Sequence, residues 1–306
     1  MYIIDMRGTK RRSHKNKRRT QINRRRKKSK LHKKHGGGVK EIIVVFELDS
    51  GDVGFFAQFW SLCHAYIYAK KNKYPFFVNS SKWNYKSKDG WHDYFTSLNE
   101  YKDDGSPKDI KQFSHVKKHI HDKYKISDYI QAIKEVYILQ GHLLREIETR
   151  RQQYGVYNSI YIRRGDKSKE NSIDPIERIL ENTNLKEQTK KLFVQSDDYR
   201  TVKEVREKIP SVEVVTITPE EKFGAHAGDI LKVDDNTRKL ETENLLISIG
   251  IFLGGEECWT DIRSNVGRFH KLSDFNRVKY YPDNKDIDIN KESTPYDLAG
   301  PGESPL

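Results

Sequence analysis

Three segments of the chain place arginine, aspartate, serine and asparagine directly after short apolar runs. They read YIRRGDK at 161–167, FVQSDD at 193–198 and RSNVGR at 263–268. Arginine offers a rigid fork of donors that suits phosphate oxygens, and a helix that starts near Ser264 would present its first amides to the same anion. Each segment alone has an ordinary structural alternative, such as a solvated Arg–Asp pair or a helix cap at Asp198. Together they indicate a ligand that carries phosphate.

These segments would meet at one edge of a parallel sheet, where the carboxyl ends of neighbouring strands lie together. The second half of the chain alternates strand-length apolar runs with stretches of helical spacing: strands at 159–164, 192–196, 212–217 and 257–260, and helices at 199–208, 240–253 and 264–272. The first half shows the same order, with a strand at 41–48, a polar loop at 49–54, a helix at 55–71 and a strand at 74–78. Two such series predict an α/β fold with two Rossmann-like halves.

The region between the two series separates the halves. Residues 99–125 are polar, which predicts mostly loop with one short helix. Ser127 is a typical N-cap, and the apolar spacing after it predicts one long helix that ends near Arg151. We therefore expect an N-terminal α/β half over residues 41–157 and a C-terminal Rossmann-like half, which binds the phosphate ligand, over residues 158–282.

Charge is distributed very unevenly along the 306 residues, whose formal net charge is +13. Residues 1–40 hold 17 Lys and Arg against one acid, whereas residues 283–306 hold two Lys against six acids. The segment between them is nearly neutral, so the basic character belongs to an arm and does not mark the body as a nucleic-acid-binding domain. Apolar residues make up only 35% of the chain, which supports disorder in part of it.

The basic arm (1–40) and the acidic tail (283–306) are both expected to be disordered. Residues 7–34 show no apolar periodicity, and their like charges repel one another. Such an arm would bind nucleic acid or another polyanion non-specifically, or serve as a nuclear or nucleolar address. A solubilising tail with no specific partner is the alternative. Residues after Pro282 hold few core formers.

Few other residues suggest chemistry. Cys63 and Cys258 lie in apolar surroundings and are expected to be buried free thiols, because two cysteines cannot make a disulfide framework. The histidines of HVKKHIH, at 115–121, sit among lysines, and we expect no metal site. No apolar stretch is long enough to span a membrane and no signal peptide is evident, which predicts a soluble, intracellular protein.

In their order along the chain, YIRRGDK, FVQSDD and RSNVGR resemble the three nucleotide-sugar motifs shared by α-1,2-, α-1,6- and protein O-fucosyltransferases. Residues 52–95, with Trp83 in SSKWNY and Trp91 in GWHDYF, resemble the matching stretch of α-1,6-fucosyltransferases more narrowly. The resemblance spans roughly residues 49–272. It implies a GT-B-like, inverting, metal-independent enzyme that transfers fucose from GDP-fucose to a glycan or glycoprotein acceptor and needs no other cofactor.

The resemblance also implies roles for individual residues. Arg163 would bind the pyrophosphate, with Arg164 beside it. The remaining implied positions are Ser264 and Asn265 at the phosphate, Gly54 and the amide of Phe55 closing from the first βα loop, Tyr85 and Tyr161 near the guanine, Asp166, Lys167, Asp197 and Asp198 shaping the site, and Arg268 as a further binding residue.

The chemistry of sugar transfer agrees with these roles. Negative charge develops on the departing GDP, and arginine and helix-end amides stabilise it where it forms. A carboxylate must also accept the proton of the attacking hydroxyl. Glu170 follows the first motif and is the candidate base, with a solvated loop glutamate as the alternative. Arg163, Glu170 and Lys167 are therefore the expected catalytic residues.

The chain departs from the family pattern in four places, one of which is that Glu170 lies one residue from the expected position of the base. Tyr161 stands where the family usually has histidine, and Gly54 is all that remains of a Gly-x-Gly turn. The segment LLISIGIFLGG, at 245–255, lacks the aspartate that reads guanine in the α-1,6 enzymes. These departures leave room for another GDP-sugar. They also leave a second hypothesis, an inactive α/β protein of the same fold that tethers polyanions through its basic arm.

Overall fold

A computed structural model describes residues 40–115, 123–165, 174–183, 185, 189–224, 227–281 and 287–299. Residues 1–39 of the basic arm lie outside the described residues, and so do Asp166, Lys167 and Glu170. The predictions for these residues are therefore not addressed by the structure. Contacts divide the chain into two units, residues 1–41 with 105–109 and residues 42–104 with 110–306. The predicted boundary between residues 157 and 158 falls inside the second unit. That the two halves are separate domains therefore stays a prediction.

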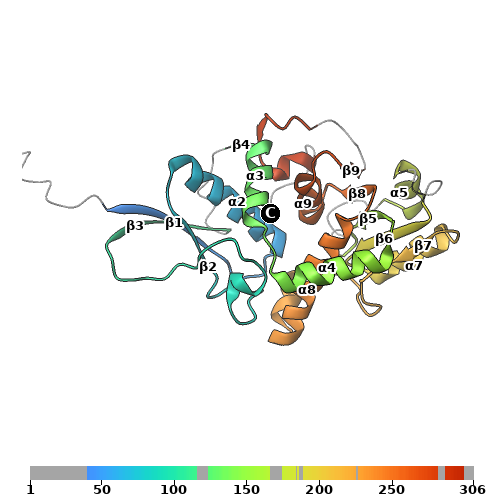
Figure 1. The fold of residues 1–306 in the computed structure, drawn as a ribbon, viewed down its shortest axis with the longest axis horizontal. Coiled ribbons are helices and arrows are strands. Elements are labelled where there is room, and N and C mark those ends of the chain that lie inside the picture. The colour runs from blue at the N-terminus through green and yellow to red at the C-terminus, as the bar shows by residue number, and fades with distance from the viewer. Residues whose placement is uncertain are drawn as a thin grey trace, which may run out of the picture. The chain divides into compact units, whose positions relative to one another are not determined.

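The first half is built on a βαβ unit, as the sequence predicts (Figure 1). β1 (Glu41–Glu47) pairs in parallel with β2 (Phe76–Asn79), and the long helix α2 (Phe55–Asn72) connects them. β3 (Lys108–Ser114) adds to the other side of β1, giving the strand order β2-β1-β3. The expectation of loop over residues 99–125 is therefore wrong for residues 108–114, because this polar stretch extends the sheet at its edge, whereas residues 101–107 lie outside the named strands and helices.

The second half contains a five-stranded parallel sheet with the order β7-β6-β5-β8-β9. Its strands are β5 (Asn158–Ile162), β6 (Lys191–Ser196), β7 (Glu213–Val215), β8 (Cys258–Asp261) and β9 (Val278–Tyr281). The helices of this half are α5 (Ile176–Thr183), α7 (Tyr199–Lys208), α8 (Asp235–Phe252) and α9 (Asn265–Ser273), with a 3₁₀ turn η3 (Ala227–Leu231).

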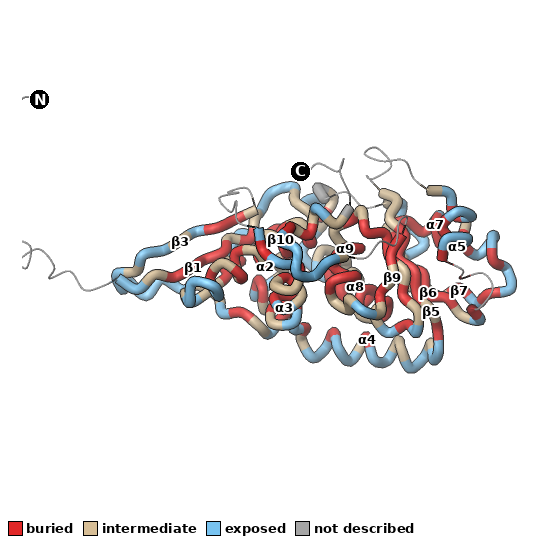
Figure 2. The backbone as a smooth tube through the Cα atoms, turned by 90° about the horizontal axis from the view of Figure 1, so that it is seen from above, coloured by how far each residue is buried: buried red, intermediate tan, exposed pale blue. Residues whose placement is uncertain are grey.

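Helices cover both faces of this sheet because its strands are apolar on both sides. Along β5, Tyr161 belongs to the core that includes α8 and α9, whereas Ile160 and Ile162 belong to the core that includes α5 and α7. Buried residues accordingly follow β5, β6 and β9 along their length (Figure 2). This arrangement confirms the predicted α/β fold with two Rossmann-like halves.

One apolar core joins the first half to α9. The ring of Phe269 lies 4.7 Å from that of Phe56 and 4.6 Å from that of Tyr137, measured between centroids. The indole N–H of Trp60 donates to the backbone carbonyl of Asn265 at 3.2 Å. Aromatic packing and this hydrogen bond therefore set the start of α9 against α2.

The long helix predicted from Ser127 to about Arg151 is wrong, because the chain forms two helices there. They are α3 (Ile126–Val136) and α4 (Gly141–Tyr154), and α4 lies beside α8 (Figure 1). Between them, the N–H of Thr96 donates to the carbonyl of Ile138, and the N–H of Gln140 donates to the carbonyl of Tyr94. These tertiary hydrogen bonds take the place of helical ones.

The expected disorder of residues 283–306 is also wrong for the part that the structure describes. β10 (Glu292–Ser293) pairs antiparallel with β4 (Tyr124–Lys125), and a 3₁₀ turn, η4 (Pro295–Ala299), contacts α9. The N–H of Ser127 donates to the carbonyl of Ile289 at 2.9 Å. A short 3₁₀ turn elsewhere, η1 (Gly90–Asp93), completes the described elements. None of the described helices combines the length and the apolar character needed to cross a membrane.

Candidate functional site

The ends of β5 and β6 meet through the carboxylate of Asp197. Nη1 of Arg163 donates to Oδ2 of Asp197 at 2.8 Å, and the backbone N–H of Arg164 donates to Oδ1 at the same distance. The side chains of Arg163 and Asp197 are 20% and 9% exposed, so water screens this pair little. Asp197 therefore fixes both the guanidinium of Arg163 and the backbone of the turn after β5.

Two phenols from different halves lie near the guanidinium of Arg163. Burial raises the pKa of Tyr161 and of Tyr85, and in both cases the positive charge of Arg163 offsets part of the rise. Both hydroxyls are therefore neutral hydrogen-bonding groups at physiological pH. The side chain of Ser264, at the start of α9, also offsets part of the rise in the pKa of Tyr161.

The start of α9 is held tightly against the end of β8. Ser264 is the N-cap, and its hydroxyl oxygen accepts the N–H of Gly267 at 2.9 Å. A Cβ atom added to Gly267 would lie 1.8 Å from the carbonyl oxygen of Asp261, so only glycine allows this approach. The first amides of the helix have no partners within it, and together with the helix dipole they favour an anion.

Arg268 orients the side chain of Asn265 at this helix start. Nη1 of Arg268 donates to Oδ1 of Asn265 at 3.1 Å, and the guanidinium lies 5.6 Å from the centroid of the Tyr296 ring. Arg268 is only 5% exposed. A guanidinium has hydrogen-bond donors and no acceptor, so it binds the carbonyl oxygen of the Asn265 side chain. The NH2 group of Asn265 is therefore turned away from Arg268. That NH2 group is suited to an anion.

Gly54 and Phe55 stand where the first βα loop enters α2. Gly54 is the N-cap of α2 at an ordinary φ of −60°, and a Cβ atom added there would contact nothing within 4 Å. The hydroxyl of Tyr85 donates to the carbonyl of Val53 at 3.4 Å, and the rings of Phe55 and Tyr85 lie 5.2 Å apart between centroids. That Gly54 and the amide of Phe55 close on the phosphate stays a prediction.

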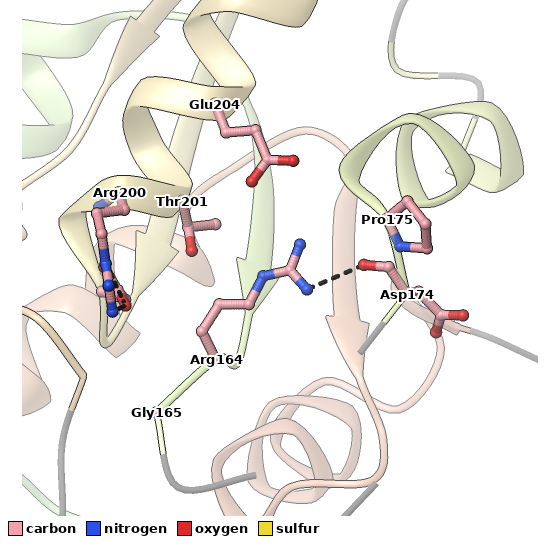
Figure 3. A pocket seen from close by; sticks show the side chains of 8 residues that line it. Arg164, Gly165, Asp174, Pro175, Arg200, Thr201 and Glu204 are labelled. Carbon is pink, nitrogen blue, oxygen red and sulfur yellow. Dashed lines mark hydrogen bonds and ion pairs between the residues drawn. The ribbon is translucent and has the colours of Figure 1, made fainter. Parts of the chain in front are cut away.

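A pocket of about 390 Å³ opens on the other side of the turn after β5 (Figure 3). Arg164 lies in it, with Nη1 donating to the carbonyl of Asp174 at 2.9 Å. Asp198 caps α7 by accepting the N–H of Arg200 at 2.9 Å. The other lining residues are Gly165, Pro175, Thr201 and Glu204. The pocket thus lies between the ends of β5 and β6 and the starts of α5 and α7.

The predicted residues fall into three groups. Hydrogen bonds join Arg163 and Arg164 to Asp197 at the ends of β5 and β6. The charge of Arg163 acts on Tyr161 and Tyr85, Ser264 also acts on Tyr161, and the ring of Phe55 lies against that of Tyr85. Asn265 and Arg268 form a second group on α9, and Arg164 and Asp198 also line the pocket. The structure gives Gly54 no specific contact with these groups, and Asp166, Lys167 and Glu170 lie outside the described residues.

Sequence reasoning missed several residues of this region. Arg263 pairs with Asp261 at 2.8 Å and with Asp174 at 3.1 Å, which joins the end of β8 to the start of α5. Its position inside RSNVGR is a signal that could have identified it. Thr201 and Glu204 of the pocket are three residues apart on α7, but their placement depends on how that helix packs. Within the part of the chain that the structure describes, no cluster of three or more His, Cys, Asp or Glu is placed to hold a metal ion.

The fold is similar to that of solved fucosyltransferases. The structure of NodZ α-1,6-fucosyltransferase soaked with GDP-fucose matches with a TM-score of 0.50 and 11% identity, over 76% of this chain and 92% of that one. Fucosyltransferase NodZ from Bradyrhizobium matches with a TM-score of 0.49 and 11% identity, over 76% and 93%. A mutant of Arabidopsis thaliana FUT1 in complex with GDP matches with a TM-score of 0.46 and 10% identity, over 86% and 80%.

At this level of identity the likeness shows the fold alone, a GT-B-like arrangement. No family model matches the chain, and no curated protein matches it.

Proposed function

We propose that this protein is a glycosyltransferase that transfers fucose from GDP-fucose to a glycan or glycoprotein acceptor. The observation that carries the proposal is the grouping of three polar strand ends at the carboxyl edge of a parallel sheet, where β5 lies between β6 and β8 and Asp197 binds Arg163. Ligands of open α/β sheets bind at this edge. The fold agrees with the proposal, because a solved structure similar to it is a fucosyltransferase soaked with GDP-fucose.

In this proposal the diphosphate of the donor lies between Arg163 and the start of α9. The bond between the anomeric carbon and the phosphate oxygen breaks while the acceptor oxygen attacks that carbon from the opposite face, which inverts its configuration. The departing GDP takes the electron pair, and Arg163, the first amides of α9 and the NH2 group of Asn265 stabilise its charge. Tyr85 and Tyr161 lie beside the nucleoside. Removing one such donor typically costs about two to three orders of magnitude in rate.

The proton of the attacking hydroxyl must pass to a base, for which Glu170 is our candidate. Lys167 and Asp166 belong to the same segment, and we propose that they complete the catalytic site. We further propose that no metal takes part, since Arg163 and the helix end supply the positive potential that a cation would otherwise provide.

The test is a transfer assay with GDP-fucose that carries a radiolabelled sugar, presented with an array of neutral and anionic glycans in the presence of EDTA. We expect label on at least one class of glycan. Arg163→Ala should reduce transfer by about two orders of magnitude or more. Arg145→Ala, at an exposed position of α4, is the charge-matched control and should leave transfer unchanged. A chain that binds GDP yet labels no glycan would contradict the transferase and favour an inactive protein of the same fold.

A further inference from the structure

The pocket beside Arg164 has the size and position of a second substrate site. It is an open hollow of about 390 Å³, within the roughly 300–1,000 Å³ of ordinary ligand pockets. Arg163 and Arg164 diverge from the same strand end: the charge of Arg163 acts on Tyr161 and Tyr85, whereas Arg164 lines the pocket between α5 and α7. The pocket is therefore separated from the proposed diphosphate position by a single turn of chain.

Most charges that line the pocket are already paired. Asp198 pairs with Arg200 at the rim. The carboxylate of Asp174 is 3.1 Å from Arg263 and points away from the hollow (Figure 3). Among the described residues, the remaining lining charges are Arg164 and Glu204, which face each other across the pocket (Figure 3). This nearly neutral lining disfavours a phosphate, because Glu204 would repel it.

The hydrogen-bonding groups of the pocket suit hydroxyl groups, which both donate and accept. Arg164 has further N–H donors beside the one directed at Asp174, Glu204 has two acceptor oxygens, and Thr201 has a hydroxyl.

We propose that this pocket binds a neutral pyranose unit. The inference rests on the proposed function, because a glycosyltransferase handles two sugars, the one on its donor and the terminal unit of its acceptor. The two sources share one chemistry, a ring with several hydroxyl groups and no charge. A charged sugar would meet Glu204 or Arg164 as a like charge, so we expect it to bind more weakly than a neutral one.

Saturation-transfer NMR on the full chain tests this directly, since it detects ligands that bind in the millimolar range. The probes are methyl α-L-fucoside for the donor sugar, N-acetylglucosamine for an acceptor unit and glucuronate as the charged control. We expect saturation transfer to one of the neutral sugars and at least fivefold less to glucuronate. The sugar that binds identifies the source.

Three variants locate the signal. Glu204→Leu and Thr201→Val should each reduce it at least fivefold, whereas Glu207→Leu, on an exposed position of the same helix, should leave it unchanged. Far-UV circular dichroism confirms that each variant is folded. Transfer to neither neutral sugar, equal transfer to glucuronate, or a signal that survives both pocket variants would overturn the inference.

Titrating the same wild-type sample with GDP separates this inference from the proposed function. A sugar signal without GDP binding would contradict the GDP-fucose donor and leave the pocket assignment standing. GDP binding without a sugar signal would contradict the pocket assignment alone.

Discussion

Asp197 and Asp198 are neighbours whose carboxylates have different roles, and replacing each with asparagine separates these roles. Asp197 accepts hydrogen bonds of 2.8 Å from the side chain of Arg163 and from the backbone N–H of Arg164. Asparagine has one carbonyl oxygen and one NH2 group. In Asp197→Asn the oxygen can accept from only one of the two donors, Arg163 or the N–H of Arg164, and the NH2 group then faces the second donor.

The magnitude follows from the burial of this pair. A hydrogen bond to a charged group contributes about 1.5–3 kcal/mol, and breaking a fully buried ion pair costs about 3–5 kcal/mol. The Arg163 side chain is 20% exposed, which places the cost of Asp197→Asn near the lower figure, at about 2 kcal/mol. Expressed in GDP affinity, this loss is about thirtyfold.

Asp198→Asn is the matched control. Asn caps a helix about as well as Asp, so the hydrogen bond from the N–H of Arg200 survives. The lost ion pair joins Asp198 to an arginine side chain that is 69% exposed, so its contribution is at most about 1 kcal/mol. The assays are calorimetric titration with GDP and urea unfolding of the full chain. Equal weakening by both substitutions, or none by Asp197→Asn, would refute the positioning role of Asp197.

Three further predictions concern the framework of the site. Gly267→Ala should destabilise the chain by about 1–3 kcal/mol in urea unfolding, because its Cβ atom meets a carbonyl oxygen, whereas Gly51→Ala, in open space, should not destabilise it. Burial holds the pKa of His270 well below its usual value of about 6.5, so stability should fall as pH drops below about 6.5, by up to about 1.4 kcal/mol per pH unit. His270→Phe should remove that part of the slope in unfolding curves measured from pH 7 to 5. Cys63 and Cys258 are buried with raised thiol pKa values, so both should react with a thiol reagent only at the rate of unfolding; fast labelling of native protein would contradict this.

Local signals in the sequence predict the elements that carry the site. The apolar run that begins near Ser159 forms β5, and Ser264 caps α9 as the sequence predicts. Apolar runs and caps act within a few residues, so their effect is visible without knowledge of the fold. The prediction that Cys63 and Cys258 are buried free thiols is confirmed for the same reason.

Most of the failed predictions concern contacts between distant parts of the chain; the exception is Ser127, which lies inside α3, because the N-cap of that helix is Lys125. The break between α3 and α4 depends on hydrogen bonds from residues 138–140 to residues 94–96. The segment 287–299 has few core formers of its own, yet it pairs with β4 and places Tyr296 over Arg268. The pocket likewise depends on the packing of α7 beside the end of β5. Periodicity and composition do not report such contacts.

Calorimetric titration of the full chain with GDP, ADP and UDP tests the central claim most directly. The account predicts saturable binding of one GDP per chain and weaker binding of ADP and UDP. Arg163→Ala should lower the affinity for GDP at least tenfold, whereas the control Arg145→Ala should leave that affinity unchanged. A folded chain that binds none of the three nucleotides, or one whose GDP affinity survives Arg163→Ala, would contradict the placement of a donor nucleotide at the ends of β5 and β6.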